Sequence, residues 1–282
     1  MSIFCIADDG IHPTTSGDTR WRESWEFDWA DVDRRLGGGC RVVLHRGTST
    51  CEVRWWLVVD GAVVEDSHEI VELPAPAVGR PLDLHLGSVA LRAVHPLRST
   101  RITSAGGSSL IFTAFGEPFT FSFSGQRVTA GDRHYEWPGS VRGTLRLAGG
   151  RTVEVDARAF HRHAWGVPSP TAPVVDAVRA VADDDVFVAV SWHRTPEGRR
   201  LPLGYIHVGE EFHGVEKARL HVDRDDSGRP RGCDLLVATA DRRDFRLIGS
   251  VIAAADGESP ALTEFRFGGV RAGGILIAAP GR

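Results

Sequence analysis

The sequence predicts an all-β chain. Apolar and polar residues alternate with a period of two along most of its length, as they do in strands that bury one face. Turn-forming pairs such as Asp-Gly, Ser-Gly and Gly-Gly recur about every 8 to 14 residues. The pattern gives roughly 16 to 20 strands, too many for one small barrel. We therefore expect two barrels or sandwiches, or one very large closed sheet.

The predicted strands follow one another with short turns between them. Residues 25–29 place aromatic side chains on one face and acids on the other. Residues 51–59 end at Asp60-Gly61, a pair typical of a type I′ hairpin turn, and 62–64 resume the strand pattern. The other predicted strands show the same alternation: 119–123, 141–147, 153–157, 185–192, 203–208, 218–222, 234–238, 244–251 and 262–267.

One helix and one domain junction complete the prediction. A helix is expected over 173–182, because Pro173 suits a first helical position and Val174, Ala177, Val178 and Val181 share one helical face. The polar, turn-rich stretch 126–132 predicts a junction near residue 130. We therefore expect an N-terminal β domain over 1–130 and a C-terminal β domain over 131–282.

Composition narrows the classes of function. The 282 residues are 42% hydrophobic and 25% charged, which is ordinary for a globular protein and unlike a disordered or fibrous one. The net charge of −4 gives no bulk attraction to nucleic acid, and no basic stripe interleaved with aromatic residues occurs. Nucleic-acid binding is therefore not expected.

The compartment signals favour a cytoplasmic protein. The N-terminus has no basic region and reaches Asp8-Asp9 before an apolar run develops, unlike a signal peptide. No segment approaches the ~18 apolar residues of a membrane span. The four cysteines have no CxxC spacing, so reduced thiols are expected. Exposed strand edges in long β chains favour homodimers, and a homodimer is the expected assembly.

The stretch from His134 to Trp165 is the richest in reactive side chains. His134-Tyr135-Glu136-Trp137 opens it, and His161, Arg162, His163 and Trp165 close it after a predicted hairpin. If the hairpin folds back, the two groups meet. His134 and Glu136 share one strand face, which suits a carboxylate orienting an imidazole, or they form an exposed pair before a turn.

Three further patterns have both a functional and a structural interpretation. His161 and His163 form an H-x-H pair on one strand face, as in a zinc or iron site, although no third ligand falls at the usual spacing. The alternative is that one histidine bonds to the backbone and the other lines a cavity. Tyr205 and His207 also share a face, and so do Glu23 and Trp25 on an aromatic strand.

Five short motifs follow one another along the chain. They are E-S-x-x-F at 23–27, H-Y-E at 134–136 with Gly139 after it, a G-x-L strand, H-R-H-A-W-G at 161–166, and G-Y-x-H at 204–207 before a D-x-x-G turn at 225–228. Their order resembles the lipocalin-like hydratase and cyclase superfamily. Its members include carotenoid hydratases, kievitone-type hydratases, tocopherol-cyclase-like proteins and natural-product cyclases and Diels–Alderases.

The resemblance spans nearly the whole chain. It implies two lipocalin-like β-barrel or sandwich domains packed side by side, an apolar pocket at or near their interface, and no metal or organic cofactor. In hydratases and cyclases of this kind a carboxylic acid protonates an alkene and aromatic residues stabilise the cation. This sequence has Arg162 where the family pattern commonly has Asp, and His161 where it has Arg. Glu136, Glu23 or Glu26 would then have to supply the proton, or the reaction does not begin with protonation.

We therefore expect a cofactor-independent lyase or isomerase that hydrates, cyclises or rearranges a hydrophobic terpenoid, steroid or polyketide. It would do so in an aromatic-lined pocket, by acid–base catalysis or by conformational templating of the substrate. Glu136 is the expected acid or base, His134 and His163 its partners, and Arg162 a contact for a carbonyl or anion. The expected substrate-binding residues are Trp25, Glu23, Tyr135, Trp137, His161, Trp165, Tyr205 and His207. Two other classes stay open: a carrier without the acid, and a metal-dependent enzyme that uses His161 and His163.

Overall fold

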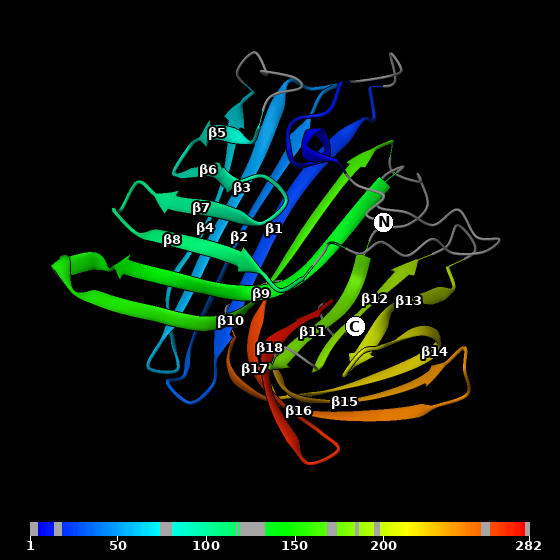
Figure 1. Ribbon diagram of the computed structural model, residues 1–282. Helices are drawn as coiled ribbons and strands as arrows, with labels where there is room; N and C mark the ends of the chain where they lie inside the picture. Colours follow the sequence, from blue (N-terminus) through cyan, green and yellow to red (C-terminus); the bar gives the residue numbers. More distant parts are fainter. Residues whose placement is uncertain are drawn as a thin grey trace. The chain divides into compact units, whose positions relative to one another are not determined.

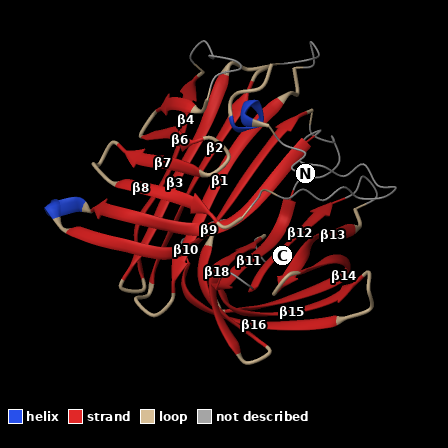
Figure 2. Ribbon diagram, viewed as in Figure 1, coloured by secondary structure: helices blue, strands red, loops and turns tan. Residues whose placement is uncertain are grey.

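The computed structural model confirms the all-β prediction. It describes residues 5–13, 19–73, 81–116, 118, 133–167, 174–183, 186–194, 198–254 and 260–279. Eighteen strands in these residues form two separate sheets, one of ten strands and one closed barrel of eight (Figures 1 and 2). Within the described ranges, none of the helices has the length and apolar character that crossing a membrane requires.

The ten-stranded sheet has the order β4-β3-β2-β1-β10-β9-β8-β7-β6-β5. Two runs of sequential strands therefore join where β1 lies beside β10. Its strands are β1 (Arg22–Asp31), β2 (Leu36–His45), β3 (Thr50–Val59), β4 (Ala62–Glu72), β5 (Asp83–Leu86), β6 (Val89–His95), β7 (Ser99–Ser104), β8 (Ser109–Ala114), β9 (Arg133–Arg146) and β10 (Thr152–Gly166). A short 3₁₀ helix, η1 (Ile6–Asp9), precedes β1, and η2 (Ala148–Gly150) joins β9 to β10.

The barrel consists of the last eight strands in sequence order, each paired with the next, and it closes between β18 and β11. They are β11 (Val174–Asp183), β12 (Val186–Arg194), β13 (Arg200–Val208), β14 (Glu211–Arg224), β15 (Pro230–Thr239), β16 (Asp244–Ala254), β17 (Ala261–Phe267) and β18 (Val270–Ala278). Its apolar core includes Trp192, Ile206, Leu235, Leu247 and Phe265. Closure pairs every strand on both sides, which leaves no sheet edge.

The chain divides into two compact units. One contains 1–27, 39–56 and 64–170, and the other contains 28–38, 57–63 and 171–282. The predicted junction near residue 130 lies outside the described residues. The strands that flank it, β8 and β9, pair with each other in the ten-stranded sheet, so the barrel begins only at β11.

Most predicted strands occur, and one prediction is wrong. Asp60 and Gly61 have φ values of 55° and 77°, as the predicted type I′ turn between β3 and β4 requires. Residues 119–123 lie outside the described residues. The helix predicted over 173–182 is instead strand β11, which pairs with β12 and β18. Residues 177–181 of β11 are all buried, so both of its faces are covered and the alternation that marks a strand is hidden.

Candidate active site

Strand order brings the reactive residues together. Because β1 lies between β2 and β10, Glu23 near the start of the chain reaches His163 on β10, 140 positions later. β10 also pairs with β9 in a register that sets Tyr135 opposite His163 and Trp137 opposite His161. The predicted meeting of the two ends of the His134–Trp165 stretch therefore occurs through adjacent strands.

Alternation along the strands separates the predicted residues into two sets. One set, here called the Trp25 face, comprises Glu23, Trp25, Phe27, Tyr135, Trp137, His161, His163 and Trp165. The other, the Glu136 face, comprises Glu26, His134, Glu136 and Arg162. Directly opposed residues share a face, and Glu136 is opposite Arg162 whereas Tyr135 is opposite His163. His163 is therefore not a partner of Glu136 or His134, because the sheet lies between them.

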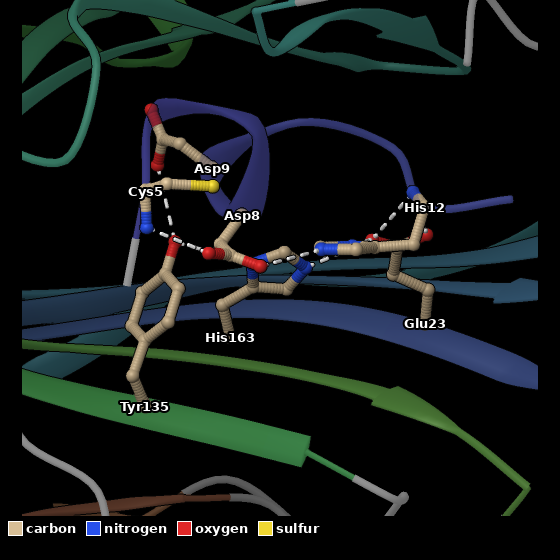
Figure 3. A network of polar contacts seen from close by, with 7 residues as sticks. All are labelled: Cys5, Asp8, Asp9, His12, Glu23, Tyr135 and His163. Atoms are coloured by element: carbon tan, nitrogen blue, oxygen red, sulfur yellow. Dashed lines mark hydrogen bonds and ion pairs between the residues drawn. The ribbon is translucent and has the colours of Figure 1, made fainter. Parts of the chain in front are cut away.

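A chain of hydrogen bonds crosses the Trp25 face (Figure 3). Glu23 Oε1 lies 2.9 Å from His163 Nε2, and His163 Nδ1 lies 3.1 Å from the hydroxyl oxygen of Tyr135. The same hydroxyl lies 3.1 Å from Oδ1 of Asp9, at the end of η1. Glu23, Tyr135 and His163 are fully buried, and Asp9 is 2% exposed. Four ionisable groups thus form one continuous network away from water.

His12 joins the network from the N-terminal segment. Its Nδ1 lies 2.7 Å from Glu23 Oε1, and its backbone N–H donates to Glu23 Oε2 at 3.1 Å. Its ring stacks on Trp165 at 3.9 Å between centroids. Asp8 lies 3.5 Å from His12 Nε2 and accepts the backbone N–H of Cys5. These contacts attach the segment that carries Asp9 and His12 to the sheet.

Sequence reasoning missed Asp9 and His12. In the sequence Asp8-Asp9 only interrupts an apolar run, and no local spacing links Asp9 or His12 to strand β1, which begins at Arg22. The usable signal is the presence of two acids and a histidine within five positions, which is weak without strand register.

The two carboxyl groups of the network have opposite pKa shifts. Burial raises the pKa of Asp9, and the lowering effects of the Leu97 amide, His163 and Tyr135 do not cancel it. Burial also raises the pKa of Glu23, but hydrogen bonds and charge from His12 and His163 outweigh it, so the net shift is downward. Relative to an exposed carboxyl group, the protonated form is therefore stabilised at Asp9 and the carboxylate at Glu23.

The groups between these carboxyls are kept neutral. Burial lowers the pKa of His163, against the raising effect of Glu23. Burial, with the nearby charge of Asp9, raises the pKa of Tyr135 well above its ordinary value. The imidazole of His163 stacks on Trp25 at 4.6 Å and lies 4.8 Å from Trp165, and Tyr135 lies 4.7 Å from Trp137. The polar chain is thus surrounded by indole rings.

The other predicted site residues lie outside this hydrogen-bonded network. His161 is on the Trp25 face, where Nδ1 donates to the carbonyl of Glu26 at 3.0 Å and the ring stacks on Phe27. On the Glu136 face, Arg162 forms an ion pair with Glu136 at 3.3 Å, and His134 is buried nearby on β9. Tyr205 and His207 are on β13 of the barrel, where His207 stacks on Phe187 at 4.1 Å. They belong to the other unit.

The residues that could together hold a metal ion are not the predicted pair His161 and His163. Ligand atoms of His12, Glu23 and His163 all lie within 4.8 Å of one another, whereas His161 is outside this group. Two imidazoles and one carboxylate form a donor set that suits zinc or ferrous iron. Among the described residues these are the side chains that could hold a metal ion, and the same atoms also satisfy one another by hydrogen bonding.

Comparisons with known proteins agree with this fold. A crystal structure of a protein provisionally named AttH, from Nitrosomonas europaea, has a TM-score of 0.71 at 14% identity, covering 96% of this chain and 94% of that one. Kievitone hydratase from Nectria haematococca has a TM-score of 0.58 at 10% identity, covering 96% of this chain and 97% of that one. At these identities the likeness concerns the fold alone. It agrees with the fold that the motif resemblance implies.

Family membership follows from the sequence itself. None of the curated proteins matches the chain. The model of one family matches residues 6–274, which include every residue of the Asp9–Glu23 network. The chain therefore belongs to the family described as a domain of unknown function, DUF7064.

Proposed function

We propose that this protein is a cofactor-independent enzyme of the hydratase or lyase type, which acts on a hydrophobic substrate by acid–base catalysis on the Trp25 face. The observation that carries the proposal is the pair Asp9 and Glu23. Two buried carboxyl groups, joined by hydrogen bonds through Tyr135 and His163, have pKa values shifted in opposite directions. Opposite shifts of this kind favour a proton donor at Asp9 and a proton acceptor at Glu23.

The chemistry of alkene hydration, or its reverse, needs both groups. A protonated carboxyl adds a proton to an alkene carbon, and a carboxylate removes a proton from the attacking water. The indole faces of Trp25, Trp137 and Trp165 suit a developing carbocation, where a desolvated cation–π contact contributes ~2 kcal/mol. The family pattern commonly has an aspartate where this sequence has Arg162, and we assign the role of that acid to Asp9.

The likeness to kievitone hydratase supports this class of reaction, and a hydrophobic terpenoid, steroid or polyketide remains the proposed substrate. Protonation without water capture would give cyclisation by the same groups. The Glu136 face offers a second candidate acid in Glu136, with Arg162 3.3 Å away as a contact for a carbonyl or an anion. Matched substitutions of Glu23 and Glu136 by glutamine separate the two faces.

Isotope incorporation tests the proposal. Purified protein without added cofactor is incubated with a panel of hydrophobic alkenes and tertiary alcohols, in deuterated water and in oxygen-18 water, and the products are analysed by mass spectrometry. Hydration predicts one carbon-bound deuterium and one oxygen-18, and cyclisation predicts deuterium alone. Glu23→Gln is expected to lower either rate by about 100-fold or more. Tight binding of the panel with no isotope incorporated would contradict the proposal and indicate a carrier.

A further inference from the structure

One cation on the Trp25 face takes no part in the network of Figure 3. Arg46 directly follows β2, and its backbone N–H donates to the carbonyl of Trp21 at 3.3 Å. This bond continues the antiparallel pairing of β1 and β2 beyond their ends, so the side chains of Arg46 and Trp21 share a face. Trp21 is two positions before Glu23, and alternation places both on one face. Arg46 therefore lies on the side of the sheet that carries the reactive residues.

The guanidinium of Arg46 lies against an indole ring. Its central carbon is 5.4 Å from the centroid of the Trp21 ring, and Trp21 is 3% exposed. Among the described residues, Nε and Nη2 of Arg46 are buried and have no hydrogen-bond partner. The residue as a whole is only partly buried, so this place is close to solvent. Two charged donors without an acceptor are unfavourable in such surroundings, and a ligand that accepts from both would relieve the cost.

Glu23 does not satisfy these donors. Burial lowers the pKa of Arg46, and the charge of Glu23 opposes that shift, so the two side chains interact through space. The oxygens of Glu23 are instead in contact with Nδ1 and the backbone N–H of His12 and with Nε2 of His163. The Arg46 donors are therefore available to an acceptor that the protein itself does not supply at this position.

The identity of the two donors indicates which acceptor fits. The hydrogens on Nε and on Nη2 point in the same direction along one edge of a guanidinium, and this edge matches the two oxygens of a carboxylate. Arg246 on β16 uses the same edge in this protein, with Nε 3.0 Å from Oδ1 and Nη2 2.6 Å from Oδ2 of Asp234. Arg54 binds Asp66 with the same two atoms, at 3.3 and 3.2 Å. In Arg46 this edge is the unpaired one.

We propose that Arg46 binds a carboxylate of the substrate through Nε and Nη2, and that the substrate is therefore a hydrophobic carboxylic acid. The inference rests on the proposed function and names the class of its substrate. The bound carboxylate lies beside the cation of Arg46, so Glu23 keeps its own partners. With one end held there, the apolar part of the substrate is fixed relative to Glu23 and Trp25, which is how a binding group contributes to orientation.

Binding to the full chain tests this subsite without turnover. Geranic acid and lithocholic acid are titrated at neutral pH beside their methyl esters, which keep the apolar part and lack the charge. Quenching of tryptophan fluorescence reports binding. In at least one pair the acid is expected to bind about tenfold or more tightly than its ester, as hydrogen bonds between charged groups contribute. If neither acid binds more tightly than its ester, the subsite is overturned.

Substitutions then assign the preference to one side chain. Arg46→Gln is expected to weaken binding of the acid by about tenfold or more and to change binding of the ester by less than about threefold. Arg46→Lys keeps the charge without the two parallel donors, and it is expected to lose most of the preference. The matched control Arg246→Gln removes a guanidinium that already binds Asp234, and it is expected to bind acid and ester as the unmodified protein does.

Thermal unfolding checks that the variants fold, and Arg46→Lys carries the test if Arg46→Gln does not. A preference for the acid that persists in Arg46→Gln, or persists in full in Arg46→Lys, would overturn the proposal. An equal loss in Arg246→Gln would overturn it as well, because the effect would then be one of overall charge.

Failure of the subsite and failure of the proposed function give different results. Acid binding that depends on Arg46, with no isotope incorporated into the bound acids or the alkene panel, would indicate a carrier of hydrophobic acids. The proposed function would then fail while the subsite stands. Turnover of an uncharged alkene that Arg46→Gln leaves unchanged, with no preference for acids, would overturn the subsite and support the proposed function.

Discussion

At the scale of single residues, position on the sheet gives identical side chains different chemistry. His161 and His163 lie on one face of β10, as the H-x-H spacing predicts. His163 contacts two ionisable groups, whereas His161 donates to a backbone carbonyl and lies between aromatic rings. The alternation is visible in the sequence. The hydrogen-bond partners of His163 are not visible there, because Glu23 is 140 positions away in the sequence and only the strand order brings it next to His163.

His161 predicts a pH dependence of stability. Burial lowers its pKa from 6.5 to about 3 in the folded protein. The unfolded chain therefore takes up a proton below about pH 6.5 that the folded protein does not, and stability falls as the pH falls toward about 3. The contribution is on the order of 2 kcal/mol between about pH 7 and pH 5.

Urea unfolding of the unmodified protein and His161→Phe at both pH values measures this contribution. The variant is expected to lose less unfolding free energy on acidification, because phenylalanine has no proton to gain. The two proteins share the titrations of His163, Glu23 and Asp9, so their difference isolates His161. An equal loss in both proteins would contradict the neutral, buried His161.

At the scale of elements, backbone approach decides where glycine is required. Gly204 on β13 has φ 150°, and a Cβ there would lie 1.9 Å from the carbonyl oxygen of Ala189 on β12. Gly209, in the turn after β13, has φ 62° and open space around it. Gly204→Ala is expected to cost about 3 kcal/mol or more, and Gly209→Ala only about 1 kcal/mol of backbone strain. Denaturant unfolding of the two variants compares these costs, and equal costs would contradict the β12–β13 pairing.

The sequence predicts a strand where one face of that strand is buried and the other is exposed to solvent. The β3–β4 hairpin follows from alternation and an Asp-Gly turn. The sequence predicts a helix where β11 lies. Residues 177–181 are buried on both faces of the strand, so valine and alanine occur there without alternation, and their spacing also fits one face of a helix. In β2 three glycines follow Leu36, and the alternation does not predict this strand because glycine carries no side chain to show a period.

At the scale of the whole molecule, the all-β character follows from the period of two and the turn spacing, which leave two barrels or sandwiches and one very large closed sheet as alternatives, whereas strand order does not follow from them. The sequence places His134 and Glu136 beside His163, and the structure places the sheet between them. A period of two tells which residues share a face only within one strand, whereas the relation between strands depends on register. Asp9 and His12 enter the site through the same long-range order.

Thiol reactivity reports on the packing of the whole chain. Cys5 is exposed, and Cys40, Cys51 and Cys233 are buried. Burial raises the pKa of Cys51 and of Cys233 to about 12, which suppresses their thiolates. A colorimetric disulfide reagent is expected to titrate Cys5 alone in the folded protein, and all four thiols in denaturant without reductant. Rapid reaction of a second thiol in the folded state would contradict the packing.

The central claim is that the reactive centre lies on the Trp25 face, and one pair of variants tests it most directly. Glu23→Gln and Glu136→Gln make the same change on opposite faces of one sheet. Their kcat/KM values are measured on one substrate and compared with the unmodified protein, with thermal unfolding to check folding. We predict a loss of about 100-fold or more for Glu23→Gln and a change of less than about threefold for Glu136→Gln. Full activity in Glu23→Gln together with a large loss in Glu136→Gln would contradict the account and move the acid to the Glu136 face.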